Sequence, residues 1–504
     1  MGSSSALIRS KLVLLIGSLC TLGLGISERP ATAQPASSAE KTPCQDGTAD
    51  GYPCQNVDLL SHLSIGGLGG ESGTRLNDIW GWTDPQSGAE YAVVGRTDAT
   101  AFVDVSDPTN PVFLGELPSH TGAGTWRDVK VYQNHAYVVS EAAGHGLQVF
   151  DLTQLRSVDD PPVTVDETAH YDLFSAAHNV AINPESGYAY VVGIQGKQSD
   201  EVAPNCGPGL HMINLSTPDA PQFAGCFNDL STAGQIARGY THDTQCVMYR
   251  GPDADYQDEE ICFSANENQI NIANVTDKNA AVTITNATYP LSGYVHQAWL
   301  TEDQRYLFVD DELDEDRGLV DKTRTLVFDV SDLDNPELVK SFSGKTGAID
   351  HNQYIKGRFA YQANYESGLR ILDISAPTNP TEVGYFDTHP ASNAAAFNGA
   401  WSTYPFFDSG IILVSSIGEG LFVLEPSFSF GPPTNLSVES GSDGRTVQLR
   451  WSISASDGSS SAPSSVKTGA SRRYRIYRST TPIDPSSEAE NRTVLDSVSV
   501  GVTS

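Results

Sequence analysis

The chain has 504 residues, with 62 Asp and Glu against 30 Lys and Arg, and a formal net charge of -32. This charge argues against nucleic acid as a partner, because neutralising phosphates requires clustered Lys and Arg, and it disfavours an anionic membrane surface for the same reason. Hydrophobic residues make up 39% of the chain, which is enough for a packed core and argues against wholesale disorder.

Residues 1–33 have the order of a secretory signal. Arg9 and Lys11 precede an apolar run over 12–26, and Ala-Thr-Ala at 31–33 offers a cleavage site of small residues. The apolar run has about 15 residues, fewer than the roughly 20 that a membrane-spanning helix needs. We therefore expect an exported protein, extracellular or at the cell surface, whose mature chain has no transmembrane span.

Six cysteines follow this leader, and an even number in an exported protein favours disulfides. Many pairings are possible in principle, and no CxxC pair of the kind that a zinc site needs is present. Pairing each cysteine with the nearest one along the chain favours the bridges Cys44–Cys54, Cys206–Cys226 and Cys246–Cys262. We predict three intramolecular bridges, no free thiol in the mature protein, and a disulfide-containing N-terminal segment over 34–56.

The middle of the chain repeats with a period of about 50 residues, which is typical of propeller blades. An apolar run that ends in a polar residue, as in LQVFDL or LRILDI, recurs seven times. The polar residues are Asp104, Asp151, Asn214, Asn274, Asp329, Asp373 and Glu425. Turn sequences such as Ser-Asp-Pro follow several of these runs, so each run is predicted to be a strand that ends in a turn.

A second marker precedes each of these runs and opens another alternating stretch. The markers are Asn77-Asp78, Arg127-Asp128, His178-Asn179, His242-Asp243, His296-Gln297, His351-Asn352 and Phe397-Asn398. Each unit therefore reads as four short antiparallel strands, and we predict an all-β, seven-bladed β-propeller over residues 57–426. The seventh unit lacks a fourth strand, so we expect VDLLSHLSI (57–65) to supply it and close the ring.

Residues 427–504 begin with a short Pro-rich joint. The strings PPTNLSVES, TVQLRWSIS and RYRIYRSTT then resemble the first half to two-thirds of a fibronectin type III domain, with Trp451 as its core tryptophan. We expect a linker followed by a truncated β-sandwich of this kind.

Long strings in residues 57–426 resemble the bacterial choice-of-anchor B family, which is built from LVIVD repeats. They include LNDIWGWTDPQSGAEYA, SEAAGHGLQVFDL, HQAWLTEDQRYLFVDDELDE and YQANYESGLRILDIS. The resemblance implies an exported propeller whose relatives carry different C-terminal anchoring modules, and it implies no reaction. This chain departs from the family in its fibronectin-like segment, which stops before any recognisable anchor.

Four histidines occupy the same place in successive units: His178, His242, His296 and His351. The innermost strand of a blade begins beside the central channel, so these side chains should cluster on one face. Neutral imidazoles that converge with Asp243 or Asp311 could hold a transition metal. Alternatively, each histidine hydrogen-bonds a neighbouring blade at the start of its strand. The second residue of the marker is Asp, Asn or Gln in all seven units, which indicates a structural role at this position.

Six carboxylates crowd residues 310–316, and Asp310, Asp311 and Glu312 are the candidate ligands for calcium, which binds six to eight oxygens. The segment lacks the glycine and spacing of a helix-loop-helix calcium site, so a solvated acidic loop is the alternative. A second acidic run over 253–260 is expected to be a solvated insertion tip.

Aromatic residues recur near the strand starts, and rings around a channel mouth suit a sugar or a peptide. The candidate ligand-binding residues are Asp78, Asp128, Asp243, Trp80 and Trp299, and further tryptophans of this kind are Trp82, Trp126 and Trp401. The alternative is packing between blades.

Two functions from different classes follow. The first is an exported binding module for a protein or glycan at the cell surface, since no GxSxG elbow or glycine-rich phosphate loop is present. The second is a metal-dependent hydrolase or lyase at the channel mouth, where a divalent metal, calcium or a transition metal, would activate water.

Overall fold

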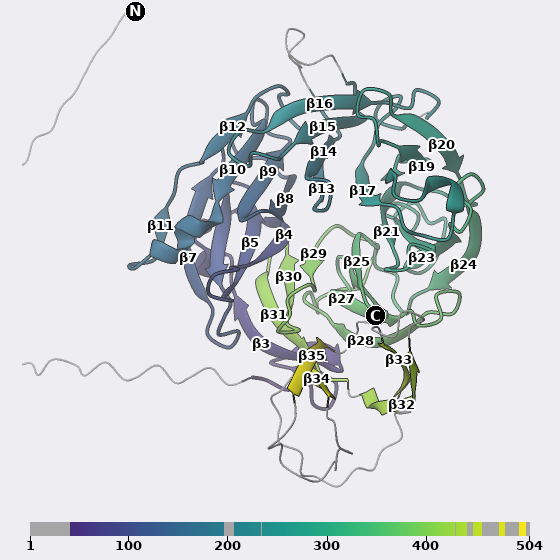
Figure 1. Ribbon diagram of the computed structural model, residues 1–504. Coiled ribbons are helices and arrows are strands. Elements are labelled where there is room, and N and C mark those ends of the chain that lie inside the picture. Colours follow the sequence, from purple (N-terminus) through teal and green to yellow (C-terminus); the bar gives the residue numbers. More distant parts are fainter. Residues whose placement is uncertain are drawn as a thin grey trace, which may run out of the picture. The chain divides into compact units, whose positions relative to one another are not determined.

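The computed structural model describes residues 41–195, 206–232 and 234–428, together with the backbone of four later strands within 430–499. The expected secretory signal over 1–33 lies outside the described residues. Seven β-sheets follow one another along the chain and form the blades of a propeller (Figure 1). The first strand of each blade contacts the first strand of the next, and β29 contacts β4, so the inner strands form a closed ring.

The first four blades run from residue 76 to residue 287. Blade 1 contains β4 (Leu76–Thr83), β5 (Glu90–Arg96), β6 (Ala99–Asp104) and β7 (Val112–Pro118). Blade 2 contains β8 (Arg127–Tyr132), β9 (His135–Ser140), β10 (Leu147–Asp151) and β12 (Ala169–Tyr171). Blade 3 contains β13 (Asn179–Asn183), β14 (Tyr188–Val192), β15 (Leu210–Asn214) and β16 (Gln222–Phe227). Blade 4 contains β17 (Asp243–Met248), β18 (Glu260–Ala265), β19 (Ile270–Asn274) and β20 (Val282–Ala287).

Three further blades complete the ring. Blade 5 contains β21 (Val295–Leu300), β22 (Tyr306–Asp311), β23 (Arg324–Asp329) and β24 (Glu337–Ser343). Blade 6 contains β25 (Asn352–Lys356), β26 (Phe359–Ala363), β27 (Leu369–Asp373) and β28 (Thr381–Phe386). Blade 7 contains β29 (Ala400–Tyr404), β30 (Ile412–Ser416), β31 (Gly420–Pro426) and the N-terminal strand β3 (Val57–Leu63), which pairs with β31. The predicted fold of seven four-stranded blades is confirmed.

The polar residue that marks the repeat has a local structural role. In blade 1 the Asp104 carboxylate accepts a hydrogen bond of 2.9 Å from the backbone N–H of Ser106, and the marker residues of blades 2 to 6 accept the same bond from the residue two positions on. Asp and Asn form such turns readily, because their short side chains reach the backbone two residues later. The marker therefore ends the third strand and starts the turn into the fourth.

Packing between neighbouring blades forms the hydrophobic core. In one cluster, Phe263 of blade 4 packs with Val309 and Leu326 of blade 5, and all three are fully buried. Alternation along each strand places its apolar residues against the adjacent blades, as a two-sided sheet in a ring requires. The core is thus distributed around the ring, and the central channel is left to polar and aromatic side chains.

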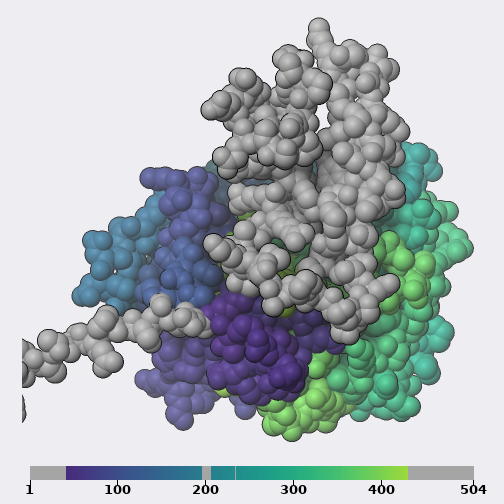
Figure 2. Space-filling model, turned by 90° about the horizontal axis from the view of Figure 1, so that it is seen from below, coloured from purple at the N-terminus to yellow at the C-terminus, as the bar shows by residue number. Residues whose placement is uncertain are grey.

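The N-terminal segment adds to two blades. Strands β1 (Thr48–Ala49) and β2 (Tyr52–Gln55) extend the sheet of blade 6, where β2 pairs with β28, and the next strand, β3, belongs to blade 7. Lys41 reinforces this attachment, with Nζ 2.7 Å from Asp58 and 2.5 Å from Glu425. Figure 2 shows this segment in purple beside yellow-green residues from near the end of the ring.

Shorter elements decorate the blades. Strand β11 (Val163–Thr164) pairs in parallel with β7, and the 3-10 helices are η1 (Gly66–Leu68), η2 (Leu152–Ser157) and η3 (Ala254–Tyr256). The described part of the chain contains no helix with the length and apolar character that crossing a membrane requires.

All three predicted disulfides are present: Cys44–Cys54, Cys206–Cys226 and Cys246–Cys262. The third joins directly paired positions of β17 and β18, on either side of the insertion at 251–259. The first closes the N-terminal segment, and the second joins the loop before β15 to the outer strand β16. Each bridge shortens a loop of the unfolded chain, which is the main way in which disulfides stabilise a fold.

Beyond blade 7 the structure describes the backbone of two antiparallel pairs. They are β32 (Phe430–Ser440) with β33 (Val447–Ala455), and β34 (Arg473–Arg478) with β35 (Thr493–Ser499).

Candidate functional site

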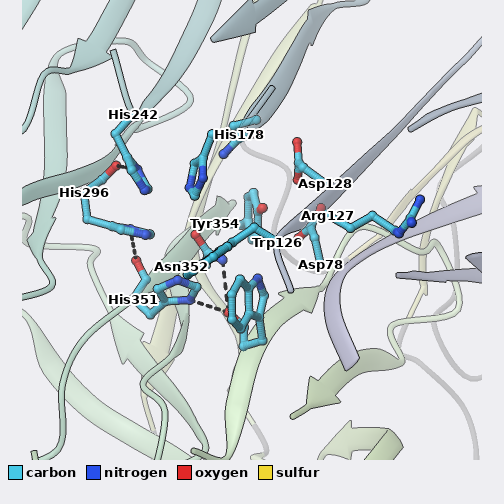
Figure 3. A pocket seen from close by; sticks show the side chains of 12 residues that line it. Asp78, Trp126, Arg127, Asp128, His178, His242, His296, His351, Asn352 and Tyr354 are labelled. Atoms are coloured by element: carbon cyan, nitrogen blue, oxygen red, sulfur yellow. Dashed lines mark hydrogen bonds between the residues drawn. The ribbon is translucent and has the colours of Figure 1, made fainter. Parts of the chain in front are cut away.

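The four predicted histidines meet at one end of the central channel (Figure 3). The ring centroids of His178 and His242 are 4.2 Å apart, those of His242 and His296 are 4.2 Å apart, and those of His296 and His351 are 4.3 Å apart. Together they line a cavity of about 20 Å³. This volume holds a water molecule or an ion, and no organic ligand.

Hydrogen bonds between blades orient three of these rings. His242 Nδ1 lies 2.9 Å from the backbone oxygen of His296, and His296 Nδ1 lies 3.1 Å from that of His351. His351 Nδ1 lies 2.6 Å from the backbone oxygen of Trp401. A carbonyl oxygen only accepts, so each Nδ1 carries the proton and donates it. These bonds join blades 4, 5, 6 and 7 in sequence, as the structural interpretation of the histidines requires.

The same bonds fix the chemistry of the opposite ring nitrogen. With Nδ1 protonated, the Nε2 of a neutral imidazole presents its lone pair. Burial, together with the charge of a neighbouring histidine, lowers the pKa of His242 and of His296 well below the usual value for histidine. Burial also lowers the pKa of His351 to about 3. The three rings are therefore neutral at physiological pH.

His296 and His351 form a possible metal-binding group with Glu312, because one ligand atom from each lies within 4.8 Å of the others. Glu312 Oε1 is 3.7 Å from His351 Nε2 and accepts a hydrogen bond of 2.7 Å from the Tyr365 hydroxyl. Burial raises the pKa of Glu312 to about 7. Two imidazoles and a carboxylate suit a transition metal, and metal-binding histidines commonly donate their other N–H to a carbonyl.

His178 differs from the other three histidines. Its Nδ1 lies 2.7 Å from Oε1 of Glu141, and its side chain is more exposed than that of His351. It contacts His242 but does not belong to the group that could hold a metal. The four histidines at equivalent positions thus have two different environments.

A buried charged cluster also lies in the channel. Lys130 Nζ is 2.9 Å from Asp78 Oδ2 and 2.7 Å from Asp128 Oδ1, and none of the three residues is more than 8% exposed. The carboxylates also join blades, because Asp78 accepts from the backbone N–H of Val129 and Asp128 from that of Val180. Burial alone would lower the pKa of Lys130, but the two carboxylates raise it well above its usual value.

Trp80 and Trp299, which the sequence analysis places at the mouth, are not part of its lining. They pack against Tyr354, with ring centroids 5.6 and 4.8 Å away, and Lys130 Nζ lies 4.8 Å from the Trp80 ring. Trp80 follows Asp78 by two positions on β4, so it shares the inward side but lies about 7 Å further along the strand. Both rings are partly exposed and lie in the channel around Tyr354, outside the lining of the mouth cavity.

The other predicted tryptophans fall into two groups. Trp126 and Trp401 line the mouth, and Trp126 is exposed, whereas Trp82 is buried between blades 1 and 2.

The predicted acidic residues do not all face the histidines. Asp310 does, with Oδ1 3.3 Å from His296 Nδ1 and 2.8 Å from the Gln297 nitrogen. Asp311 lies on the opposite side of β22, because neighbouring residues of a strand alternate, and it accepts hydrogen bonds from Tyr289, Gly293 and Tyr294. The expectation that Asp311 joins the histidines is therefore wrong.

Asp243 is buried beneath the histidines and outside the lining of the cavity. Its Oδ1 accepts a hydrogen bond of 2.6 Å from the N–H of the next residue, Thr244, and burial raises its pKa.

The second acidic run is only partly a solvated tip. Glu260 is buried, with Oε2 2.7 Å from Lys278 Nζ, and its Oε1 accepts a hydrogen bond of 2.6 Å from Tyr190. Glu260 is the first residue of β18, where it faces blade 3, whereas the residues before it lie in the insertion.

Sequence reasoning missed Lys130 and Tyr354, which occupy the channel. A signal for Lys130 was present, because it follows Asp128 by two positions in the alternating strand RDVKVY and must share its side. Tyr354 has the same relation to Asn352. Applying alternation to every inner strand would have found both.

Two segments match the model of the LVIVD repeat, residues 90–117 and residues 352–388. No curated protein matches this chain. Among solved structures, the β-propeller domain of Cps50 (Swd1) from Myceliophteria thermophila is similar, with 10% identity and a TM-score of 0.43 over 70% of this chain and 99% of that one. The computationally designed protein Ika8 is similar with 9% identity and a TM-score of 0.41, over 69% of this chain and 82% of that one. The two matched segments lie in blades 1 and 6, so the propeller contains LVIVD repeats.

Proposed function

We propose that this protein is an exported interaction module that binds a partner protein through the loops around the channel mouth. We call this side of the ring the mouth face. It carries the loops that lead into the first strand of each blade. The second strand of a blade runs antiparallel to the first and returns to this side of the ring. The loops between the second and third strands therefore lie on the mouth face as well.

The distribution of exposed apolar side chains is the observation that carries this proposal. The large apolar residues that are exposed in loops of the mouth face are Trp126, Leu230, Ile236, Leu291, Leu319 and Phe397. Within the described residues, the other exposed large apolar side chains lie on outer strands and none lies on the opposite face. Exposed apolar side chains gathered on one face favour a protein-binding surface.

The proposal also includes the compartment of the protein, its location at the cell surface, the closure of the ring and the nature of the C-terminal module. Three disulfides support an oxidising compartment outside the cytoplasm. The sequence resemblance to choice-of-anchor B proteins supports a location at the cell surface. The pairing of β3 with β31 supports ring closure by the N-terminal strand, and the two later strand pairs support a fibronectin-like module.

The volume of the mouth cavity argues against the hydrolase or lyase hypothesis. The cavity beside His296 and His351 is about 20 Å³, and each of these side chains is only 4% exposed, so an organic substrate would have little access to them. A glycan site in the channel meets the same difficulty. The loops of the mouth face, and not the channel, are therefore the better candidate for recognition.

A binding experiment with matched variants tests this proposal. The purified protein is immobilised and exposed to extracellular proteins of its source, and in parallel to a glycan array. Ile236→Ser changes an exposed mouth-face residue, and Val282→Ser changes an equally exposed residue of an outer strand. We expect a bound protein that the first variant loses at least about tenfold and the second retains. Equal loss in both variants, or glycan binding without protein binding, would contradict the proposal.

A further inference from the structure

Three buried carboxylates meet between blades 5 and 6, behind the histidines. Asp314 and Glu315 lie in the loop between β22 and β23, and Asp350 lies just before β25. The exposed fractions of these residues are 0%, 6% and 1%, and one oxygen from each lies within 4.8 Å of the others. Carboxylates are almost never buried so completely without a partner of opposite charge.

Four oxygens of this cluster have no hydrogen-bond partner. They are Asp314 Oδ1, both oxygens of Glu315, and Asp350 Oδ1. Ionised carboxylates normally accept several hydrogen bonds when buried, and each one left without a donor is costly. The neighbouring carboxylates contrast with them, because both oxygens of Asp311 and both of Asp310 accept hydrogen bonds from the protein.

Positive charge near the cluster is insufficient. Among the residues that the structure describes, Arg324 is the one basic residue that pairs with it, through Oδ2 of Asp314 at 2.6 Å, and the same guanidinium lies 3.7 Å from Asp311. Three carboxylates and one guanidinium leave a formal charge of -2. A divalent cation would neutralise that charge and would supply a partner for the four free oxygens.

We propose that Asp314, Glu315 and Asp350 bind a calcium ion that joins the loop of blade 5 to the start of blade 6. The donor atoms are all oxygens, which hard cations prefer over the nitrogen and sulfur ligands of zinc. A dehydrated, carboxylate-rich cage favours Ca²⁺, because Mg²⁺ usually retains several waters. Backbone carbonyl oxygens or water would complete the coordination.

The position of this site explains what the cation does. Asp350 directly precedes His351, and Glu312, which faces the histidines, lies two residues before Asp314. The same loop carries Leu319, one of the exposed residues of the mouth face. A bound cation would therefore fix His351 at the start of blade 6 and a loop of the mouth face, and this role does not depend on the proposed partner.

Shared protons are the competing way to neutralise the cluster. In the absence of a cation, burial and the charge of Asp350 raise the pKa of Glu315 to about 11. A carboxylic acid at this position would make the cluster indifferent to Ca²⁺, so the two alternatives differ in a measurable property.

Thermal unfolding of the full chain decides between them. Protein freed of metal with a chelator is titrated with Ca²⁺ and, separately, with Mg²⁺, and bound calcium is counted by elemental analysis. We expect uptake of a single Ca²⁺ per chain and a rise in Tm of at least about 3 °C at saturation, with a smaller rise for Mg²⁺. An absence of uptake and of any rise, or an equal rise with Mg²⁺, would overturn the proposal.

Matched variants locate the effect. Glu315→Gln and Asp350→Asn should abolish the rise in Tm that Ca²⁺ causes. Asp316→Asn, which changes an exposed residue of the same loop, should retain that rise. Glu315→Gln removes a free carboxylate, so the metal-free variant should be no less stable than the metal-free parent, and loss of folding does not obscure the result. Loss of the rise in Asp332→Asn, at a second acidic group near the surface, would instead place the ion there and overturn the assignment.

Discussion

Two clusters of buried carboxylates in this propeller differ in where their positive charge comes from. Asp78 and Asp128 enclose Lys130 and accept backbone hydrogen bonds from the next blade. Asp314, Glu315 and Asp350 have four oxygens without a donor, and the arginine beside them, Arg324, pairs with Asp314. In the first cluster the chain supplies its own cation, although Asp78 Oδ1 accepts no hydrogen bond and burial raises the pKa of Asp128 well above its usual value. The second needs a cation or protons from the solvent, so its stability can respond to the surroundings.

Removing the internal cation of the first cluster should have the largest effect. Lys130→Met leaves two carboxylates buried without their partner, and we expect it to lower the free energy of unfolding by about 3–5 kcal/mol. Urea unfolding of the two proteins measures the difference. Lys322→Met, at an exposed lysine, should cost less than about 0.5 kcal/mol. A small effect of Lys130→Met would mean that the carboxylates are already protonated.

A buried ionisable group can also be kept neutral without any partner charge, and His211 represents this third arrangement. It is fully buried, Nε2 lies 2.7 Å from the Tyr171 hydroxyl, and burial lowers its pKa to about 4. Below pH 6.5 the unfolded chain binds a proton that the folded chain does not. Stability is therefore lost as the pH falls from 6.5 to about 4, by about 3 kcal/mol for this residue.

The variant His211→Gln should remove that part of the pH dependence. Urea unfolding at pH 7 and pH 4.5 should show a smaller loss of stability in the variant than in the parent protein. An unchanged difference between the two pH values would show that His211 binds a proton in the folded state.

The same change of a carboxylate to an amide should have opposite outcomes in the two clusters. Asp78→Asn removes a paired charge, and we expect a loss of about 2 kcal/mol. Glu315→Gln removes an unpaired one, and in metal-free protein we expect no loss. Chemical unfolding of both variants in the presence of a chelator makes the comparison, and equal losses would show that the two clusters do not differ.

An exposed ion pair gives the smallest expected effect. Arg250 pairs with Glu185 at the surface, where solvent screens both charges. Arg250→Gln should lower the stability far less than Lys130→Met does, and 1 M salt should reduce even that small loss. A loss as large as that of Lys130→Met would remove the distinction between buried and exposed pairs.

The sequence predicts the blades because their signal is regular. Alternating strands recur in every blade, and the polar residue that starts the turn recurs in blades 1 to 6. The cysteine pairs follow from proximity in the sequence within that pattern. Strands β1, β2 and β11 could not be predicted, because segments of two to four residues contain no period and depend on a neighbouring blade for pairing.

The candidate site could be predicted only in outline. The position of four histidines at one end of the channel follows from their place in the repeat. The acidic string over 310–316 indicates a cation site. Which of its oxygens remain free is decided outside the string, because donors at 289–297 bond to Asp310 and Asp311. Asp350, also outside the string, completes the cluster of free oxygens. Such partners are distant in the sequence, and only the fold brings them within hydrogen-bond distance.

The pairing of β3 with β31 also has a consequence for the order in which the protein is made. His62 Nε2 and the backbone oxygen of Glu419 are 2.8 Å apart but separated by 357 residues in the sequence. During synthesis, β3 therefore cannot pair with β31 until nearly all of the ring has been made. Contacts between such distant positions form slowly. Blade 7 cannot be completed until almost the whole ring has emerged from the ribosome, so the nascent chain lacks the contacts that complete this blade for most of its synthesis.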